Sequence, residues 1–279
     1  MRLRTIATRS LIGALAGAAL LFGFAGPAQA YPGSGDDRMS SAPTSWWTYQ
    51  GVTPGFVATT LSNNHARLTD LRVTSTSPLL FSVTEVDNTT GPFASAWWWY
   101  YGVSLNQVNS LLGQNNARLI SAVRYGDSYA VVMVSNTGAN AKAWGWCDTN
   151  FAGVISCMNS ILGGPGRLTN IQSYAPDRFV TIFVDNGENL GWCWFAGISR
   201  AALNNVCNGM SLLDITANPD GSFNVAAVAQ NGDGRVHDFG SPGELVSYAL
   251  APPPDRPLFV QPYVTNGTTR WITSFRHNS

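Results

Sequence analysis

Residues 97–119, WWWYYGVSLNQVNSLLGQNNARL, contain the pattern that decides the fold of this chain. A run of aromatic residues comes first, a stretch of helical character follows, and an Arg-Leu or similar pair then opens a β-hairpin. The pattern occurs five times in 279 residues, and its leucines are spaced by 51, 49, 44 and 46 residues. This spacing predicts an array of like structural units. The five pairs are Arg67-Leu68, Arg118-Leu119, Arg167-Leu168, Ser211-Leu212 and Pro257-Leu258.

Each unit should combine a helix with a small sheet. In the second copy, we expect an aromatic strand over 97–101, a helix over 104–113, a strand from residue 118, and a strand over 129–135 after a turn at Gly126-Asp127. The sequence therefore predicts an α+β repeat: five units of about 45–50 residues, each a short helix plus a three-stranded antiparallel meander. Strands that are apolar on both faces favour a closed or strongly curved array, because one unit alone would expose a hydrophobic face.

The N-terminus has the pattern of a secretory signal peptide. Residues 1–30 combine Arg2, Arg4 and Arg9 with an apolar stretch and the small-residue cleavage site Ala28-Gln29-Ala30. Residues 31–45 are rich in Pro, Gly, Ser and Asp, so we expect a flexible spacer. Residues 46–279 should form a single domain. No second apolar stretch approaches the roughly 20 residues needed to span a bilayer. The sequence predicts a secreted, extracellular protein without membrane insertion.

Charge argues against several partner classes. Removing the three leader arginines from 16 basic and 16 acidic residues leaves a formal charge of −3. Such a chain offers no field for nucleic acid or anionic lipid. Lys142 is the only lysine, and alanine and glycine are abundant, which indicates a GC-rich genome such as that of an actinobacterium.

The stretches Tyr100-Tyr101-Gly102-Val103-Ser104 and Asn116-Ala117-Arg118-Leu119-Ile120-Ser121 carry a family resemblance. The units resemble the tandem repeats of polyglycine-hydrolase-type secreted proteins, in which several copies accompany a class C β-lactamase-like hydrolase domain. That active site needs Ser-x-x-Lys, and Lys142 has Ala139 three residues before it. The resemblance therefore implies a repeat domain without its hydrolase.

Four cysteines lie in the third and fourth units, and export favours disulfides. Cys147 and Cys193 occupy equivalent positions, and Cys157 or Cys207 follows near the helix, so pairing within each unit repeats one design. Equivalent positions in adjacent units would lie about 10 Å apart, beyond the roughly 7 Å limit on the Cα separation in a disulfide. We predict Cys147 to Cys157 and Cys193 to Cys207. A zinc site is the alternative, but no Cys-x-x-Cys occurs.

No catalytic, metal or cofactor motif stands out. The three histidines, His65, His237 and His277, are scattered, and Asp127-Ser128 is interpreted as a hairpin turn because the nucleophile-elbow pattern is incomplete. Residues 231–234, Asn-Gly-Asp-Gly, have too few carboxylates for a calcium loop and are also interpreted as a turn. We therefore predict no metal and no cofactor.

The recurring arginines and tryptophans remain. Arg67, Arg118 and Arg167 should be structural, by bonding helix carbonyls or bridging to the next unit. Most tryptophans should pack between units, Trp47 and Trp98 among them. Partly exposed tryptophans anchor sugars and protein partners, and the candidate contacts are Trp99, Trp144 and Trp194.

These observations predict a non-enzymatic repeat protein that binds a macromolecular partner. A protein partner comes first, because in the family that the chain resembles the repeats accompany a hydrolase acting on proteins. A cell-surface glycan is the alternative and rests on the tryptophans. A second alternative is a secreted hydrolase with an unrecognised serine site.

Overall fold

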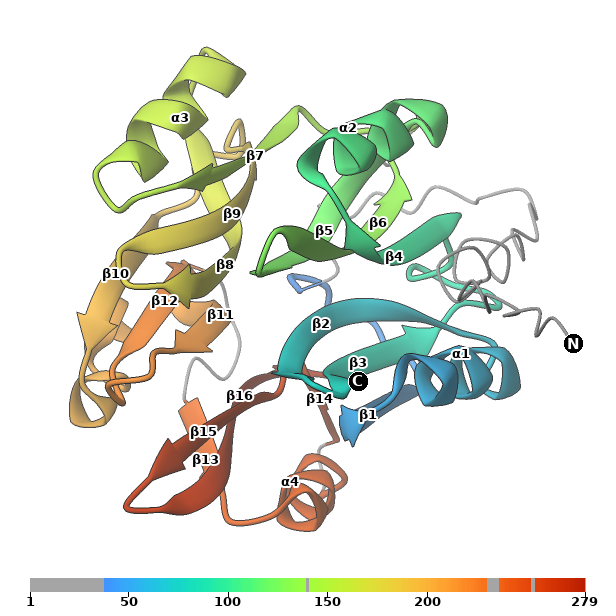
Figure 1. The fold of residues 1–279 in the computed structure, drawn as a ribbon, viewed down its shortest axis with the longest axis vertical. Helices are drawn as coiled ribbons and strands as arrows, with labels where there is room; N and C mark the ends of the chain where they lie inside the picture. The colour runs from blue at the N-terminus through green and yellow to red at the C-terminus, as the bar shows by residue number, and fades with distance from the viewer. Residues whose placement is uncertain (1–37, 139–140, 230–235, 252–253, 279) are drawn as a thin grey trace, which may run out of the picture.

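The computed structural model describes residues 38–138, 141–229, 236–251 and 254–278, which form five consecutive units around a common centre (Figure 1). Units 1 and 2 contain β1 (Trp46–Val52), α1 (Pro54–Asn63), β2 (Ala66–Thr76), β3 (Leu79–Asp87), β4 (Trp97–Val103), α2 (Leu105–Gln114), β5 (Ala117–Tyr125) and β6 (Ser128–Ser135). Unit 3 contains β7 (Trp144–Thr149), α3 (Gly153–Leu162), β8 (Gly166–Ala175) and β9 (Arg178–Asp185). Units 4 and 5 contain β10 (Trp192–Ile198), η2 (Arg200–Ala202), η3 (Val206–Gly209), β11 (Ser211–Ala217), β12 (Phe223–Val228), β13 (Val236–Phe239), α4 (Pro242–Ala249), β14 (Asp255–Pro257), β15 (Gln261–Thr265) and β16 (Thr268–His277).

Three of the four α-helices in the described residues begin at a capping side chain. Thr53, Ser104 and Ser241 each accept a hydrogen bond from the backbone amide three residues further on, which satisfies one of the unpaired amides of the first turn. Four units contain an α-helix of eight to ten residues. Unit 4 has two 3-10 helices instead, so the prediction of one equivalent short helix in every unit is wrong there.

The strand order differs from the predicted meander. In unit 1 the order is β1-β3-β2, and units 2, 3 and 4 repeat it. The first strand and the strand after the helix run in the same direction, because both are antiparallel to the middle strand. A hairpin cannot join two parallel strands, so the helix carries the chain across the sheet and the last strand fills the gap. Unit 5 has four strands, since β14 and β15 both pair with β16.

A β-bulge follows the repeated leucine in four units. The register shifts between Leu68 and Asp70 in β2, and the same shift follows Leu119, Leu168 and Leu212. A bulge inserts one extra residue and re-aims the side chains next to it. In unit 5 the corresponding strand is interrupted between β14 and β15.

The main hydrophobic clusters extend from the helix and sheet of one unit into the next unit. One cluster joins Leu68 of unit 1 to Trp99 of unit 2, and others join units 2 and 3, units 3 and 4, and units 4 and 5. In the described residues no strand pairs with a strand of another unit, so side-chain packing holds the array together. The five repeated leucines are all buried, as predicted, with exposed fractions of 0 to 2% for Leu68, Leu119, Leu168, Leu212 and Leu258.

Units 1 and 5 also touch. Trp46 packs against the cluster formed by α4, Val260 and Phe275. The Ser82 hydroxyl donates to the Val260 carbonyl at 2.9 Å, and an Arg72 Nη1 donates to the Gln261 side chain at 2.8 Å. None of the five sheets is itself closed or strongly curled. The first and last units meet through apolar packing and through hydrogen bonds from side chains of unit 1.

The segment before β1 was expected to be flexible, and for its described part this is wrong. Arg38 and Met39 are 3% and 5% exposed. Met39 packs with Leu213 and Val228 of unit 4. Farther along, the amide of Thr44 donates to the Asn278 side chain at 2.9 Å. Long-range contacts, which composition does not reveal, order residues 38–45. The rest of the predicted spacer and the whole predicted signal peptide lie outside the described residues.

Both predicted disulfides are present. Cys147 is bonded to Cys157 and Cys193 to Cys207, with Cα separations of 6.5 and 6.0 Å. The first ties β7 to α3, and the second ties β10 to η3. Two disulfides indicate an extracellular or otherwise oxidising environment.

Removing either disulfide should destabilise the protein. The bonds close loops with sequence separations of 10 and 14 residues, for which the loss of loop-closure constraint amounts to roughly 2 to 4 kcal/mol each. Urea unfolding of the paired alanine variants at Cys147/Cys157 and at Cys193/Cys207 measures this. Unchanged unfolding midpoints in both variants would show that the disulfides do not stabilise the protein.

Candidate functional site

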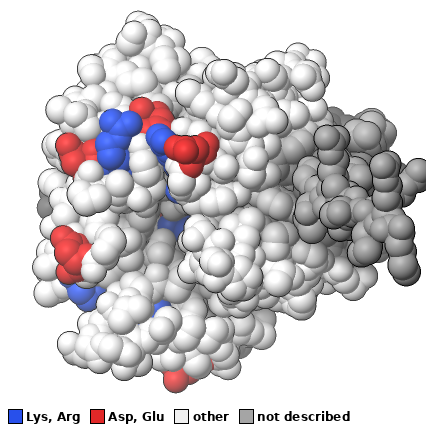
Figure 2. All heavy atoms as spheres, viewed as in Figure 1, with Lys and Arg blue, Asp and Glu red and all other residues white. Residues whose placement is uncertain are grey.

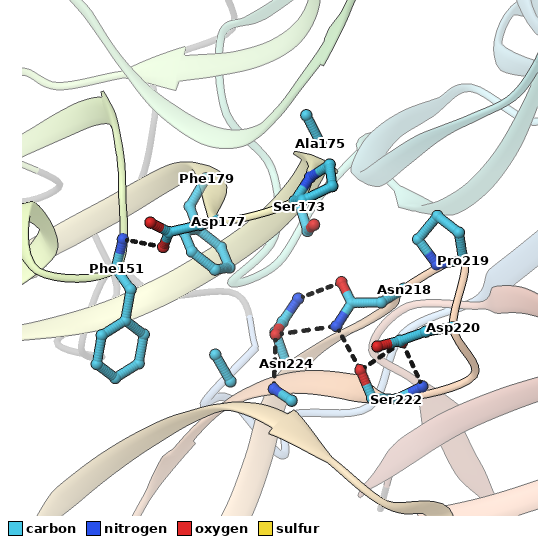
Figure 3. Close-up of a pocket in the computed structure, with 13 residues that line it drawn as sticks. Phe151, Ser173, Ala175, Asp177, Phe179, Asn218, Pro219, Asp220, Ser222 and Asn224 are labelled. Atoms are coloured by element: carbon cyan, nitrogen blue, oxygen red, sulfur yellow. Dashed lines mark hydrogen bonds between the residues drawn. The ribbon is translucent and has the colours of Figure 1, made fainter.

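A groove of about 450 Å³ lies between units 3 and 4 (Figure 3). Its walls are the turn between β8 and β9, the turn between β11 and β12, the bulged end of β10, and the loop that precedes α3. Pockets of this size accommodate part of an extended ligand. The lining side chains, all within the described residues, include no lysine or arginine.

The wall formed by the β11–β12 turn is a network of side-chain amide groups. Asn224 Nδ2 donates to Asn218 Oδ1 at 2.7 Å, and Asn218 Nδ2 donates to Asn224 Oδ1 at 3.2 Å and to Ser222 Oγ at 2.9 Å. The backbone amide of Gly197 also donates to Asn224 Oδ1, at 3.1 Å. These bonds fix the turn of unit 4 against the bulge of β10, so the polar wall is pre-organised.

Two exposed carboxylates flank the groove from opposite sides, Asp177 from unit 3 and Asp220 from unit 4 (Figure 3). Hydrogen bonds from the Ser222 hydroxyl and amide lower the pKa of Asp220 below its ordinary value, so this group is ionised at neutral pH. Asp177 Oδ1 accepts from the Phe151 amide at 2.8 Å, which ties the loop before α3 to the β8–β9 turn. The groove is therefore negatively charged.

An aromatic pair forms one end of the groove. Phe151 is 49% exposed and packs on Trp194, with ring centroids 4.6 Å apart and an interplanar angle of 36°. Phe179, which is buried, meets Trp194 edge-on at 6.2 Å. Trp194 thus contacts two rings, and about half of the Phe151 side chain remains available to a ligand.

The three tryptophans predicted as ligand contacts differ in location and exposure. Trp194 lies beside the groove. Trp144 is partly buried in the cluster between units 2 and 3. Trp99 is only 2% exposed, in the cluster between units 1 and 2, so the prediction that it contacts a ligand is wrong. The structure does not bring the three together, because each belongs to a different inter-unit cluster. Trp47 and Trp98 are packed between units, as predicted.

The residues that line the groove were not predicted from the sequence. Asp177, Asn218 and Asp220 occupy tight turns, where such residues are expected for their conformation alone. Phe151 gave the only signal, since an aromatic residue in the polar loop Asn150-Phe151-Ala152-Gly153 has no strand or helix face to occupy.

The recurring arginines are structural, as predicted. Arg67, Arg118 and Arg167 are at most 4% exposed. Arg67 Nε donates to the Phe93 carbonyl at 2.6 Å, in the connection between units 1 and 2. Gly126-Asp127 forms the turn between β5 and β6, which confirms the hairpin interpretation of Asp127-Ser128.

A second polar cluster joins units 2 and 3. Asp148 accepts hydrogen bonds from the hydroxyls of Tyr129 and Tyr174, both at 2.5 Å, from Arg124 at 2.8 Å and from Arg178 at 3.2 Å. Partial burial opposes ionisation, but the bonds from the tyrosines and Arg124 outweigh it and lower the pKa of Asp148. The carboxylate is fully engaged in holding two units together.

Asp238 plays the same part between units 4 and 5. It accepts from the Tyr263 hydroxyl at 2.6 Å, from Arg270 at 2.8 Å and from Arg200 at 3.2 Å. Figure 2 shows that charged side chains on the viewed face are sparse and gather in small groups of mixed sign. Mixed groups of this kind offer no extended field to a polyanion.

The histidines lie apart from the groove lining. His277 pairs with Asp255 at 2.8 Å, and His237 stacks against Phe239. Lys142 Nζ lies 3.9 Å from a Glu188 carboxylate oxygen. Within the described ranges no group of three or more His, Cys, Asp or Glu side chains is arranged to hold a metal ion. The Asn-Gly-Asp-Gly stretch at 231–234 lies outside the described residues.

Comparison with known proteins leaves the resemblance and the function open: no protein-family model matches the chain, and no curated protein matches its sequence. No helix in the described part of the chain is long and apolar enough to cross a membrane.

Proposed function

We propose that the chain is a secreted, non-enzymatic binding protein that holds a segment of a partner protein in the groove between units 3 and 4. In this proposal residues 1–30 direct export, and the five units form a closed array that keeps the groove rigid. The two disulfides support export, and the contacts between units 1 and 5 support closure.

One observation carries the proposal: an open, negatively charged groove ends in an exposed ring that is already held in place. Aromatic side chains in fixed positions are typical anchors of protein interfaces. The charge of Asp177 and Asp220 favours a partner segment with basic side chains. The repeats of the resembling hydrolases, which act on proteins, point to the same class of partner.

A glycan is the second candidate, favoured by the Phe151–Trp194 pair next to an amide network. Sugars stack their apolar faces on such rings, and amides bond their hydroxyls. A neutral glycan would depend on Phe151 but little on the two carboxylates. A protein segment with basic residues would depend on both.

Replacing Phe151 with alanine should weaken partner binding by at least about tenfold, the loss expected for an interface anchor, without changing the melting temperature. The measurement is capture of extracellular proteins and glycans by the immobilised protein, followed by a titration with the captured partner. Phe195→Ala is the matched control. Phe195 lies in β10 and is as exposed as Phe151, but it does not line the groove.

Equal capture by wild type, Phe151→Ala and Phe195→Ala would contradict the groove as the site. Asp220→Asn separates the two partner classes, because only a basic protein segment should lose affinity and salt dependence together. Labelling of a single serine by a fluorophosphonate probe would instead favour the remaining alternative, a serine hydrolase.

A further inference from the structure

The guanidinium of Arg38 lies at the centre of the five units. Its Nη1 donates to the carbonyls of Thr169 in unit 3 and Leu213 in unit 4, at 3.1 and 3.0 Å. Its Nη2 donates to Asp70 Oδ1 in unit 1 at 2.7 Å, and Asp214 Oδ1 lies 3.5 Å from Nη1. One side chain from the N-terminal segment therefore contacts three units.

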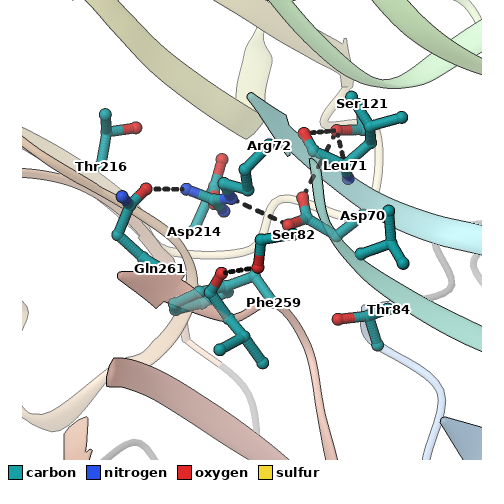
Figure 4. A network of polar contacts seen from close by, with 12 residues as sticks. Asp70, Leu71, Arg72, Ser82, Thr84, Ser121, Asp214, Thr216, Phe259 and Gln261 are labelled. Atoms are coloured by element: carbon teal, nitrogen blue, oxygen red, sulfur yellow. Dashed lines mark hydrogen bonds and ion pairs between the residues drawn. The ribbon is translucent and has the colours of Figure 1, made fainter. Parts of the chain in front are cut away.

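The receiving site is built by equivalent positions of the four bulged strands. The residues that follow the bulge are polar in every case: Asp70, Ser121, Asn170 and Asp214. All four are at most 1% exposed. The bulges re-aim these side chains toward the centre, where Figure 4 shows part of the resulting network.

Three of these side chains, Ser121, Asn170 and Asp214, also accept a bond from the preceding unit. The Leu71 amide donates to Ser121 Oγ at 3.2 Å, the Ala122 amide donates to Asn170 Oδ1 at 3.4 Å, and the Ile171 amide donates to Asp214 Oδ2 at 2.7 Å. Asn170 Nδ2 donates to the same Asp214 oxygen at 2.6 Å. The acceptors that face Arg38 are thus held by the units themselves.

Charge balance favours a second cation at this centre. Arg72 Nε donates to Asp70 Oδ2 at 2.8 Å, and Arg72 also pairs with Asp214. Two buried carboxylates facing one guanidinium would leave an uncompensated negative charge, which is costly away from water. Arg38 supplies the missing charge, and its planar group meets acceptors from three directions, which an ammonium group would match poorly.

The backbone of the same segment is fastened to unit 5. Arg276 Nε donates to the carbonyl of Arg38 at 3.1 Å, and Arg256 Nη2 donates to the carbonyl of Ser40 at 3.0 Å. Asn278 Nδ2 donates to the carbonyl of Thr44 at 2.8 Å. The segment thus runs from the centre to the last strand of the chain, and it contacts units 1, 3, 4 and 5.

We propose that the centre of the array is a guanidinium-binding site, which Arg38 fills so that the N-terminal segment clasps the units together. The site is distinct from the groove and does not depend on the proposed function. Its ligand is defined by chemistry: a planar cation that bonds one carboxylate and two backbone carbonyls while it neutralises a second carboxylate.

Chemical rescue tests the proposal on the full chain. Arg38→Ala should lower the melting temperature, and guanidinium chloride at about 20 mM, far below the molar range in which it denatures, should raise it again by roughly 2 to 4 °C. Sodium chloride at the same ionic strength should not do so. Arg38→Lys should remain less stable than wild type, because its ammonium cannot meet the same set of acceptors.

The matched control is Leu119→Val, a variant that is destabilised at a buried site without a cation. Guanidinium should not raise its melting temperature or that of wild type. If guanidinium does not raise the melting temperature of Arg38→Ala, just as it does not raise that of Leu119→Val, the proposal is overturned. If Arg38→Ala does not fold, Arg38→Gln, which retains hydrogen-bonding groups, takes its place in the same titration, with the same two outcomes.

Discussion

Replacing Leu119 with alanine is expected to lower the free energy of unfolding by about 2 to 5 kcal/mol. Leu119 is 1% exposed, and its cluster contains Val131 and Met133 of unit 2 with Val180 and Ile182 of unit 3. Deleting the side chain therefore leaves a cavity between two units, lined by strands that cannot collapse independently. Equilibrium unfolding in urea, followed by tryptophan fluorescence, measures the loss.

Leu105→Ala is the matched control, since Leu105 lies in the same unit at the start of α2 and is 44% exposed. This change should stay within about 0.5 kcal/mol of wild type, as is usual for exposed positions. An equal loss at both leucines, or a loss at Leu119 no larger than at Leu105, would contradict the assignment of Leu119 to the core between units.

Replacing Glu85 with glutamine is expected to raise the free energy of unfolding by up to about 3 kcal/mol at about pH 8, and to change it little at about pH 4. Glu85 lies in β3 and is fully buried. Burial raises the pKa of its carboxyl from 4.5 to about 7, although hydrogen bonds from Thr60 at 2.8 Å and Asn64 at 3.2 Å act in the opposite direction.

The stability depends on pH because Glu85 binds its proton more tightly in the native protein than in the unfolded chain. Between about pH 4.5 and 7 the native protein holds a proton on Glu85 that the unfolded chain has released, so stability falls as the pH rises through this window. Glutamine is neutral throughout and removes that slope. Unfolding free energies of wild type and variant across the window measure the difference. Glu188→Gln, at an exposed site, is the control, and parallel profiles for wild type and Glu85→Gln would refute the role of Glu85.

Local sequence patterns predicted the parts of the fold that depend on local chemistry. The repeated leucines fell at buried positions because each follows the helical segment of its unit, and four of them lie at the start of the strand that comes next. The disulfides were predicted from an expected equivalence of Cys147 and Cys193. The register places them two positions apart in the repeat, with Cys147 three residues after Trp144 and Cys193 one residue after Trp192, so they still share one face of the strand. The helix predicted over 104–113 is found as α2 (Leu105–Gln114), because the Ser104 side chain supplies an acceptor for an unpaired amide of the first turn.

The strand order and the 3-10 helices of unit 4 could not be predicted in the same way. Which strand pairs with which depends on how the helix crosses the sheet, and the hydrophobic pattern is the same for a meander and for the observed order. In unit 4, the segment that is an α-helix in the other units contains Cys207 at a φ of +60°. Because an α-helix needs a negative φ, this segment forms 3-10 helices instead.

Arg38 and the groove show a different limit. The contacts of Arg38 join residues 131 and 175 positions apart, and the composition around it is typical of a flexible segment. A signal was nevertheless present: Asp70, Ser121, Asn170 and Asp214 place a polar residue two positions after the repeated leucine in four units. Trp99 was misassigned because its place on an alternating strand cannot tell a solvent-facing position from one covered by the next unit.

The central claim is that the main hydrophobic clusters extend from one unit into the next, so that the five units form one cooperative structure. Hydrogen exchange in mild denaturant, compared between wild type and Leu119→Ala, tests it most directly. We predict that amides in β2, β5, β8, β11 and β16 all lose protection by the same free energy, although the cavity lies only between units 2 and 3. A loss confined to β5, β6 and their immediate neighbours would contradict the claim and show that the units unfold one by one.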